Sequence, residues 1–158
     1  MTAHRVLAVA LAASVVLLNF AIEHIWIALQ GPATVLRGFL DYLPALNRGV
    51  SFGLLRQEGN TGRVVLILAL TIVTVFVAFL AWRSSNRLQA AGYGLVMGGA
   101  IGNLMDRVLD GAVFDYLFLH LGRFPLFVFN FSDAAISAGV MLLAADALLS
   151  SRTPAIDS

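Results

Sequence analysis

The feature that most constrains the fold is an uncharged apolar run from Val64 to Trp82. Its nineteen residues approach the roughly 20 that an α-helix needs to cross the hydrocarbon core of a bilayer. The chain as a whole is 59% hydrophobic and 12% charged, whereas soluble domains are about 45–50% apolar and about 25% charged. The run therefore predicts a transmembrane helix, and the composition predicts an integral membrane protein.

Three more stretches have the length and character of membrane spans. Arg83 and Arg87 bracket the short turn after the first run, and arginines concentrated in a tight turn indicate the cytoplasmic side. Four spans would then place both termini in the cytoplasm. The span that begins at Val6 lies so near the N-terminus that it resembles a signal peptide, but its length favours a retained membrane anchor. The three further spans are Val6 to about Leu29, Leu88–Met105 and Phe127–Leu149.

The segments between the spans differ in character. Gln30–Gly62 is punctuated by glycine and proline and contains short apolar pieces, which predict short strands on a small platform outside the membrane. Residues 106–126 are expected to form an outer loop or short helix. The predicted fold is thus an all-α membrane protein, a single domain over residues 1–158. It has four transmembrane helices, a small extracytoplasmic β-rich cradle and a loop or short helix between spans three and four.

Several function classes are disfavoured by composition. The formal net charge of +1 offers no electrostatic basis for binding nucleic acid. The chain has no cysteine, which excludes a thiol nucleophile and thiolate metal sites. Its three histidines are scattered and form no metal-binding motif, so we predict neither a metal nor a cofactor.

The segment from Gly98 to Asp133 holds four of the nine acidic residues: Asp106, Asp110, Asp115 and Asp133. Carboxylates at a membrane edge are costly, which makes them functional candidates. At 1.5 Å per residue, Asn103 lies about 22 Å from the start of its span, and Asp133 about 24 Å from the end of its own. Because the hydrocarbon core is about 30 Å thick, both side chains should lie just below the outer surface. Asp115 can fold back over the same place.

A pair of carboxylates at this depth suits hydrolysis. One ionised carboxylate can take a proton from water while its protonated neighbour polarises a peptide carbonyl, and the second ionisation is opposed by the first charge. Structural explanations also exist. Ser132 or Asp133 could cap the last helix, and Asp106 could pair with Arg107. Buried carboxylates also serve proton relays in transporters, although no inverted repeat is visible here.

Four short motifs resemble those of lipoprotein signal peptidase, also called signal peptidase II. In order, they match N-x-G-x-[AS]-F, GGAxGNxxDR, G-x-V-x-D and F-N-x-[AS]-D. Each motif alone is weakly specific, but four in the correct order form a strong resemblance. They occupy Asn47–Phe52, Gly98–Arg107, Gly111–Asp115 and Phe129–Asp133.

This resemblance implies an aspartic endopeptidase of the bacterial inner membrane that removes signal peptides from diacylglyceryl-modified prolipoproteins. Its active site would face outward, with Asp115 and Asp133 as the catalytic pair. The implied partners are prolipoprotein substrates, membrane lipids and the cyclic-peptide inhibitors of the family. The implied supporting or substrate-binding residues are Asn47, Gly49, Phe52, Gly99, Asn103, Asp106, Arg107 and Asn130.

One box departs from the family pattern. The first span of the family usually carries D-Q-x-[ST]-K, but the corresponding acid and base are here Asn19 and Glu23. The pair keeps its i, i+4 spacing, so both side chains share one helix face. We expect Glu23 to find a cationic partner, either Arg107 or Arg48. The alternative function is a divergent paralogue that binds substrates or inhibitors without full activity.

Overall fold

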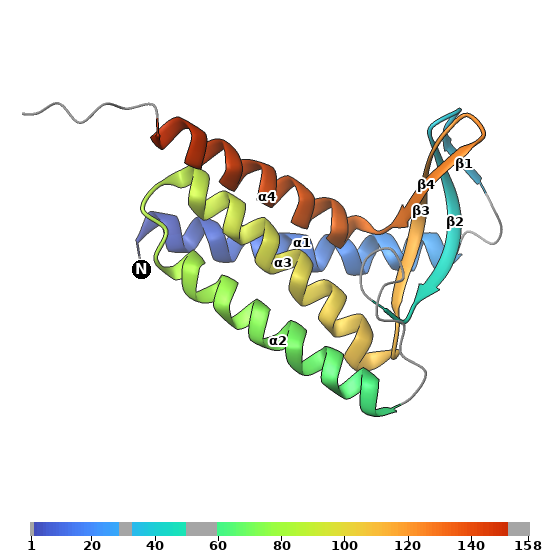
Figure 1. Ribbon diagram of the computed structural model, residues 1–158, viewed down its shortest axis with the longest axis horizontal. Helices are drawn as coiled ribbons and strands as arrows, with labels where there is room; N and C mark the ends of the chain where they lie inside the picture. The colour runs from blue at the N-terminus through green and yellow to red at the C-terminus, as the bar shows by residue number, and fades with distance from the viewer. Residues whose placement is uncertain (1, 29–32, 50–59, 152–158) are drawn as a thin grey trace, which may run out of the picture.

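The computed structural model describes residues 2–28, 33–49 and 60–151. Within these residues, four helices lie side by side and a four-stranded sheet crosses one end of them (Figure 1). The helices are α1 (Ala3–Ala28), α2 (Asn60–Trp82), α3 (Arg87–Leu109) and α4 (Phe131–Ser150). The strands are β1 (Ala33–Leu36), β2 (Leu40–Asn47), β3 (Val113–Leu121) and β4 (Phe124–Phe129).

Each predicted span corresponds to a helix. Three helical segments of the described chain are long and apolar enough to cross a membrane, namely Ala3–Ile25, Thr61–Trp82 and Phe131–Ser150. Helix α3 has the required length, but its glycines and its charged C-terminal turn set it apart from these three. That α3 also crosses the membrane remains a prediction.

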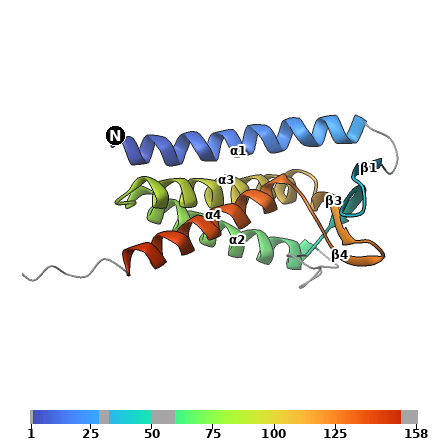
Figure 2. The ribbon, with the colours of Figure 1, turned by 90° about the horizontal axis from the view of Figure 1, so that it is seen from above.

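Helix α3 lies at the centre of the bundle and packs against the other three helices (Figure 2). Its glycines permit this packing. A Cβ at Gly94 would lie 2.7 Å from the carbonyl oxygen of Ala8 on α1, and one at Gly98 would lie 2.8 Å from the Cα of Ala12. The four-residue glycine repeat therefore serves close helix packing, as small-xxx-small stripes do in membranes.

The strands form an antiparallel sheet in the order β1-β2-β3-β4. The pairing of β2 with β3 sets Ala45 opposite Asp115 and Asn47 opposite Val113. The register shifts between Tyr42 and Ala45, where Pro44 lacks the N–H needed for a ladder bond. The sheet thereby brings the end of β2 beside Asp115, although Asn47 and Asp115 are 68 residues apart.

The expected loop or short helix over residues 106–126 is wrong. Helix α3 continues to Leu109, and Gly111 then turns the chain with a φ of 80°, which favours glycine. The following residues are rich in aromatic and β-branched side chains and form the β3–β4 hairpin, which turns at Gly122. The last helix accordingly begins at Phe131, because Phe127–Phe129 belongs to β4.

Candidate active site

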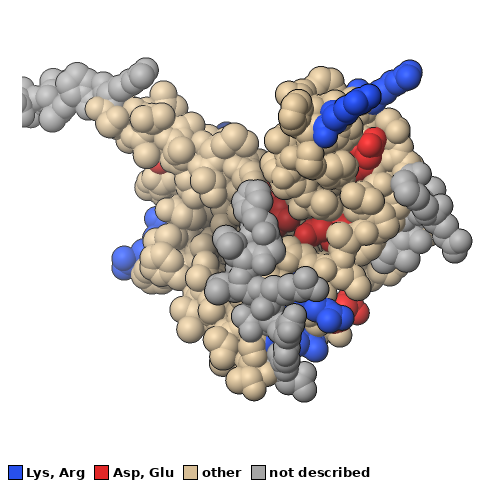
Figure 3. All heavy atoms as spheres, turned by 45° about the vertical axis from the view of Figure 1, so that its right-hand side comes forward, with Lys and Arg blue, Asp and Glu red and all other residues tan. Residues whose placement is uncertain are grey.

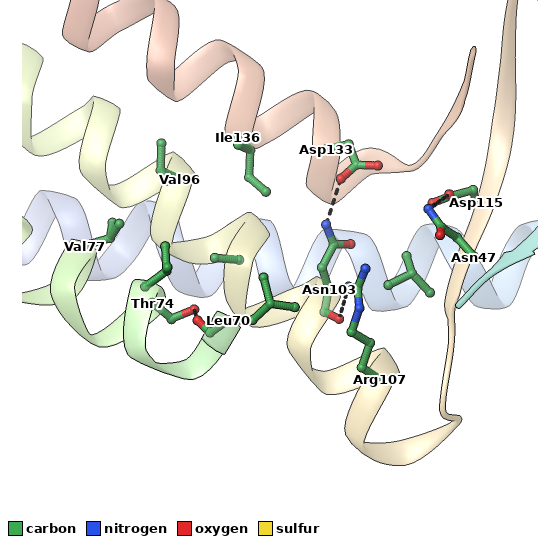
Figure 4. A pocket seen from close by; sticks show the side chains of 13 residues that line it. Asn47, Leu70, Thr74, Val77, Val96, Asn103, Arg107, Asp115, Asp133 and Ile136 are labelled. Carbon is green, nitrogen blue, oxygen red and sulfur yellow. Dashed lines mark hydrogen bonds between the residues drawn. The ribbon is translucent and has the colours of Figure 1, made fainter. Parts of the chain in front are cut away.

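Two aspartates from different elements line one cavity of about 190 Å³. Asp115 lies near the start of β3, the strand that follows α3, and Asp133 lies in the first turn of α4 (Figure 4). The space-filling view shows acidic side chains in the hollow between the sheet and the helices (Figure 3). The structure therefore places these two carboxylates close to each other, as predicted.

The carboxylate of Asp115 is held by two side-chain amides. Asn47 donates from Nδ2 to its Oδ2 at 3.0 Å, and Asn130 donates from Nδ2 to its Oδ1 at 3.2 Å. Only 3% of Asp115 and none of Asn130 is exposed. Because β2 supplies Asn47 and the β4–α4 junction supplies Asn130, two separate segments fix this one carboxylate.

Asp133 is held by a related arrangement. Asn103 on α3 donates from Nδ2 to Oδ1 of Asp133 at 2.8 Å (Figure 4). Asn130 is the N-cap of α4, since its Oδ1 accepts the backbone N–H of Asp133 at 2.9 Å. Asn130 also donates to Oδ1 of Asn103 at 3.0 Å. Hydrogen bonds thus run without a break from Asp115 through the two asparagines to Asp133.

Arg107 supports this site through the backbone. Its Nη2 donates to the carbonyl oxygen of Gly49 at 2.6 Å, and its Nη1 donates to the carbonyl oxygen of Asn103 at 2.9 Å. Asn47 Oδ1 in turn accepts the N–H of Gly49 at 3.0 Å. The arginine therefore anchors the end of β2 to α3 and makes no ion pair with Asp106 among the described residues.

The environment of Asp115 changes its acidity. Burial raises the pKa of Asp115 from 3.8 to about 6, the hydrogen bond from Asn47 lowers it, and the charge of Asp133 raises it further. Arg107 has a smaller lowering effect. A carboxyl group with this pKa can hold or release a proton near neutral pH, as acid–base catalysis requires.

The divergent residues of the first span lie behind this cavity. Asn19 Nδ2 donates to Oε1 of Glu23 at 2.8 Å, and the carboxyl of Glu23 contacts that of Asp106. The expectation that Glu23 would pair with Arg107 or Arg48 is wrong. No such ion pair occurs in the described part of the chain, because Arg107 is directed at two backbone carbonyls.

The structure brings most of the predicted site residues together. Asn47, Asn103 and Arg107 line the cavity with the two aspartates, and Asn130 and Gly49 contact those residues directly. Gly99 lies where α3 meets α4 at Ser132. Phe52 is outside the described residues. Among those described, no group of three or more His, Cys, Asp or Glu side chains could hold a metal ion.

Two features of the site were not predicted. The fully buried Tyr116 accepts the backbone N–H of Phe131 at 3.2 Å and so ties β3 to the start of α4. An apolar wall also flanks the two aspartates. Of its residues only Ala100 belongs to a motif, and the others stand unmarked within long hydrophobic runs. The wall consists of Leu70, Val73 and Val77 from α2, Val96 and Ala100 from α3, and Ile136 from α4.

Comparison with known proteins identifies the family of the chain. The family model described as Signal peptidase (SPase) II matches residues 8–149. Two similar relatives are lipoprotein signal peptidases. That of Beijerinckia indica is 41% identical over 122 residues, or 76% of this chain and 73% of its own. That of Methylorubrum extorquens is 43% identical over 120 residues, or 75% of this chain and 70% of its own.

The fold is also found among solved structures. A bacterial membrane enzyme solved by the in meso method at 2.3 Å resolution superposes with a TM-score of 0.82 at 22% identity. The match covers 96% of this chain and 93% of that one. A second such enzyme, solved at 1.9 Å, gives a TM-score of 0.75 at 23% identity, covering 89% of this chain and 92% of that one. With the family match extending over nearly the whole chain, the protein belongs to the signal peptidase II family of membrane peptidases.

Proposed function

We propose that this protein is an aspartic endopeptidase that removes the signal peptide from diacylglyceryl-modified prolipoproteins. Asp115 and Asp133 act as its catalytic pair. The observation that carries this proposal is their convergence, from β3 and α4, on one cavity in which two asparagines connect them. Structural aspartates need no such shared cavity.

The chemistry needs one proton between the two carboxyl groups. The ionised carboxylate removes a proton from a water molecule, whose oxygen attacks the scissile carbonyl carbon, while the protonated carboxyl donates to the carbonyl oxygen. Collapse of the tetrahedral intermediate breaks the C–N bond. The leaving nitrogen takes the proton from the first aspartate, and a hydroxyl of the intermediate returns its proton to the second aspartate as the new carboxyl group forms. We assign the proton to the pair rather than to one residue, because either carboxyl group could serve as the base.

The surroundings suit a substrate that is part peptide and part lipid. The apolar wall from α2, α3 and α4 gives the cavity a hydrophobic side, and the polar side is formed by asparagines and Arg107. A signal peptide is an apolar segment, so it fits against the wall while its cleavage site meets the carboxylates. We place the enzyme in the bacterial inner membrane, with four crossings, both termini in the cytoplasm and the active site at the outer face.

The second candidate function is a divergent paralogue that binds substrates or inhibitors without cleaving efficiently. It is favoured by one observation, that an acid–acid contact between Glu23 and Asp106 stands where the family box carries a basic residue. This contact lies behind the cavity, whereas the hydrogen bonds around Asp115 and Asp133 are complete. The peptidase is therefore the better-supported function.

The decisive experiment measures cleavage of a lipidated prolipoprotein in proteoliposomes. We expect Asp115→Asn and Asp133→Asn each to abolish cleavage, since each carboxyl group has a separate role in the reaction. Loss of a catalytic group in such a pair costs on the order of 10²–10⁴-fold in rate. Folding would be checked by thermal unfolding in detergent.

A matched control lies at the other end of the bundle. Asp146 on α4 is also a buried aspartate held by two side-chain amides, from Asn86 at 2.8 Å and Gln89 at 2.7 Å. Asp146→Asn should lower stability while leaving turnover per folded molecule near the wild-type value. Cleavage that survives in Asp115→Asn or Asp133→Asn would remove that residue from the catalytic pair.

A further inference from the structure

A second pair of acids lies behind the catalytic cavity, between α1 and α3. Glu23 is 9% exposed, and its carboxyl lies beside that of Asp106. Asn19, Glu23, Asp106 and Asp110 line a small cavity of about 120 Å³ here, separate from the one that holds Asp115 and Asp133. No step of the proposed reaction uses this pair.

Hydrogen bonds connect the pair to both catalytic segments. On one side, Asn19 donates to Glu23 at 2.8 Å and accepts the backbone N–H of Ser132 at 3.2 Å, directly before Asp133. On the other side, Asp106 interacts with the backbone N–H of Phe114, directly before Asp115. The acid pair thus lies between the segment that carries Asp133 and the segment that carries Asp115, and it has a polar contact to each.

The contact between the two acids requires a proton. Oδ2 of Asp106 is buried and has no hydrogen-bond donor among the described residues unless one of the acids is protonated. No described arginine or histidine forms an ion pair with either acid, and two adjacent carboxylates, one buried and one half-buried, would be unfavourable without a counter-charge. The titratable groups around Glu23 are the acids Asp106, Asp110 and Asp115 and the exposed His24, which lines the same cavity. A proton held between the carboxyl groups removes one charge and satisfies the buried oxygen.

We propose that Glu23 and Asp106 share one proton and act as positioning residues for the two catalytic aspartates. Their hydrogen bond completes the link from the N-terminal turn of α4, through α1, to the end of α3 and the start of β3. The role in catalysis rests on the proposed peptidase activity, whereas the shared proton is a property of the fold. In this chain the acid pair connects the two catalytic segments, and Glu23 stands at a position where the family motif carries a basic residue.

The kinetic test breaks and then restores the hydrogen bond. Glu23→Leu removes it, and we expect kcat to fall by about tenfold to hundredfold, since a small displacement of reacting groups has effects of this size, with little change in KM. Glu23→Gln can donate to a charged Asp106 without a shared proton, so kcat should return to within about fivefold of wild type. Ile25→Ala, two residues further along α1 at a side chain that is 61% exposed, is the matched control and should leave kcat unchanged.

The spectroscopic test does not depend on activity. In an Asp115→Asn background, infrared difference spectra between the proteins with Glu23 and with Glu23→Gln should show the C=O stretching band of a protonated carboxyl only in the former. Thermal unfolding would show whether each variant is folded.

The outcomes separate the two proposals. Absence of the band, or a Glu23→Gln variant as impaired as Glu23→Leu, would overturn the shared proton or its positioning role. If the wild type fails to cleave prolipoproteins, the proposed function fails, while the infrared comparison still decides whether the proton is shared.

Discussion

At the residue scale, the site holds its carboxylates with amides rather than with positive charges. Asp115 and Asp133 accept hydrogen bonds from asparagines, and Arg107 directs its donors to backbone carbonyls. A guanidinium bonded directly to a carboxylate would strongly favour the ionised form. Amides orient the carboxylates with a weaker effect on their charge, so the pair can keep the one proton that its chemistry needs.

This arrangement predicts the pH dependence of cleavage. Since burial raises the pKa of Asp115 to about 6, the pair loses its proton as the pH rises above that value, and kcat/KM should decline there. The hydrogen bond from Asn47 lowers this pKa, so Asn47→Ala should move the decline to higher pH. A pH–rate profile of both proteins in proteoliposomes measures the shift.

The control removes a similar amide from a different aspartate. Gln89→Ala deletes a donor to Asp146, remote from the cavity, and should leave the profile in place. A profile of Asn47→Ala that moves to lower pH, or not at all, would contradict the assignment.

The stability of the folded protein should also decrease as the pH rises. The folded chain holds the proton of Asp115 more tightly than the unfolded chain, so its contribution to the free energy of unfolding decreases as the pH rises from about 4 to about 6.

At the scale of the elements, the sequence predicted the helices better than the sheet. The uncharged run predicted a membrane-length helix, and the structure has one there. The β3–β4 hairpin was missed because β3 carries apolar residues on both faces, so the alternation that marks a strand is weak. The partner of Glu23 was missed because it depends on how α3 is rotated against α1, which spacing along one helix does not reveal.

The asparagine network illustrates the same limit. Simple counting along two spans predicted that Asn103 and Asp133 lie at one depth, and they form a hydrogen bond of 2.8 Å. The bond between Asn47 and Asp115 depends instead on strand register across 68 residues. Local pattern contains no information on such a register, and only the resemblance to a family placed these two residues in one site.

Two neighbouring glycines of α3 provide a test at this scale. A methyl group at Gly99 would strike the backbone carbonyl of Ser132 on α4, and one at Gly98 would strike α1 at Ala12. Each alanine variant should lose about 1–3 kcal/mol of stability through overpacking. Only Gly99→Ala displaces the turn that carries Asp133, so it should reduce kcat per folded molecule several times more than Gly98→Ala. Thermal unfolding and cleavage rates measure the two effects, and equal losses of kcat would contradict the argument.

At the scale of the whole molecule, the proposed active site lies where the helical bundle meets the sheet. The strands run across the end of the bundle while the helices run away from it (Figure 1). Asp115 belongs to the sheet and Asp133 to the first turn of a helix. If the helices cross the bilayer, a carboxylate pair at this junction lies at the membrane surface, where water and a lipid-anchored peptide can meet.

This placement requires α3 to cross the membrane although it is the least apolar of the four helices. The chain has no cysteine, so single cysteines can report topology without further changes. We expect Arg123→Cys, in the turn between β3 and β4, to react with a membrane-impermeant maleimide in intact cells. Ser85→Cys, in the turn between α2 and α3, should react only after the cells are lysed, because the proposed topology places that turn in the cytoplasm. Labelling of both cysteines from the same side would show that α3 does not cross, and it would leave the site without the depth that its chemistry requires.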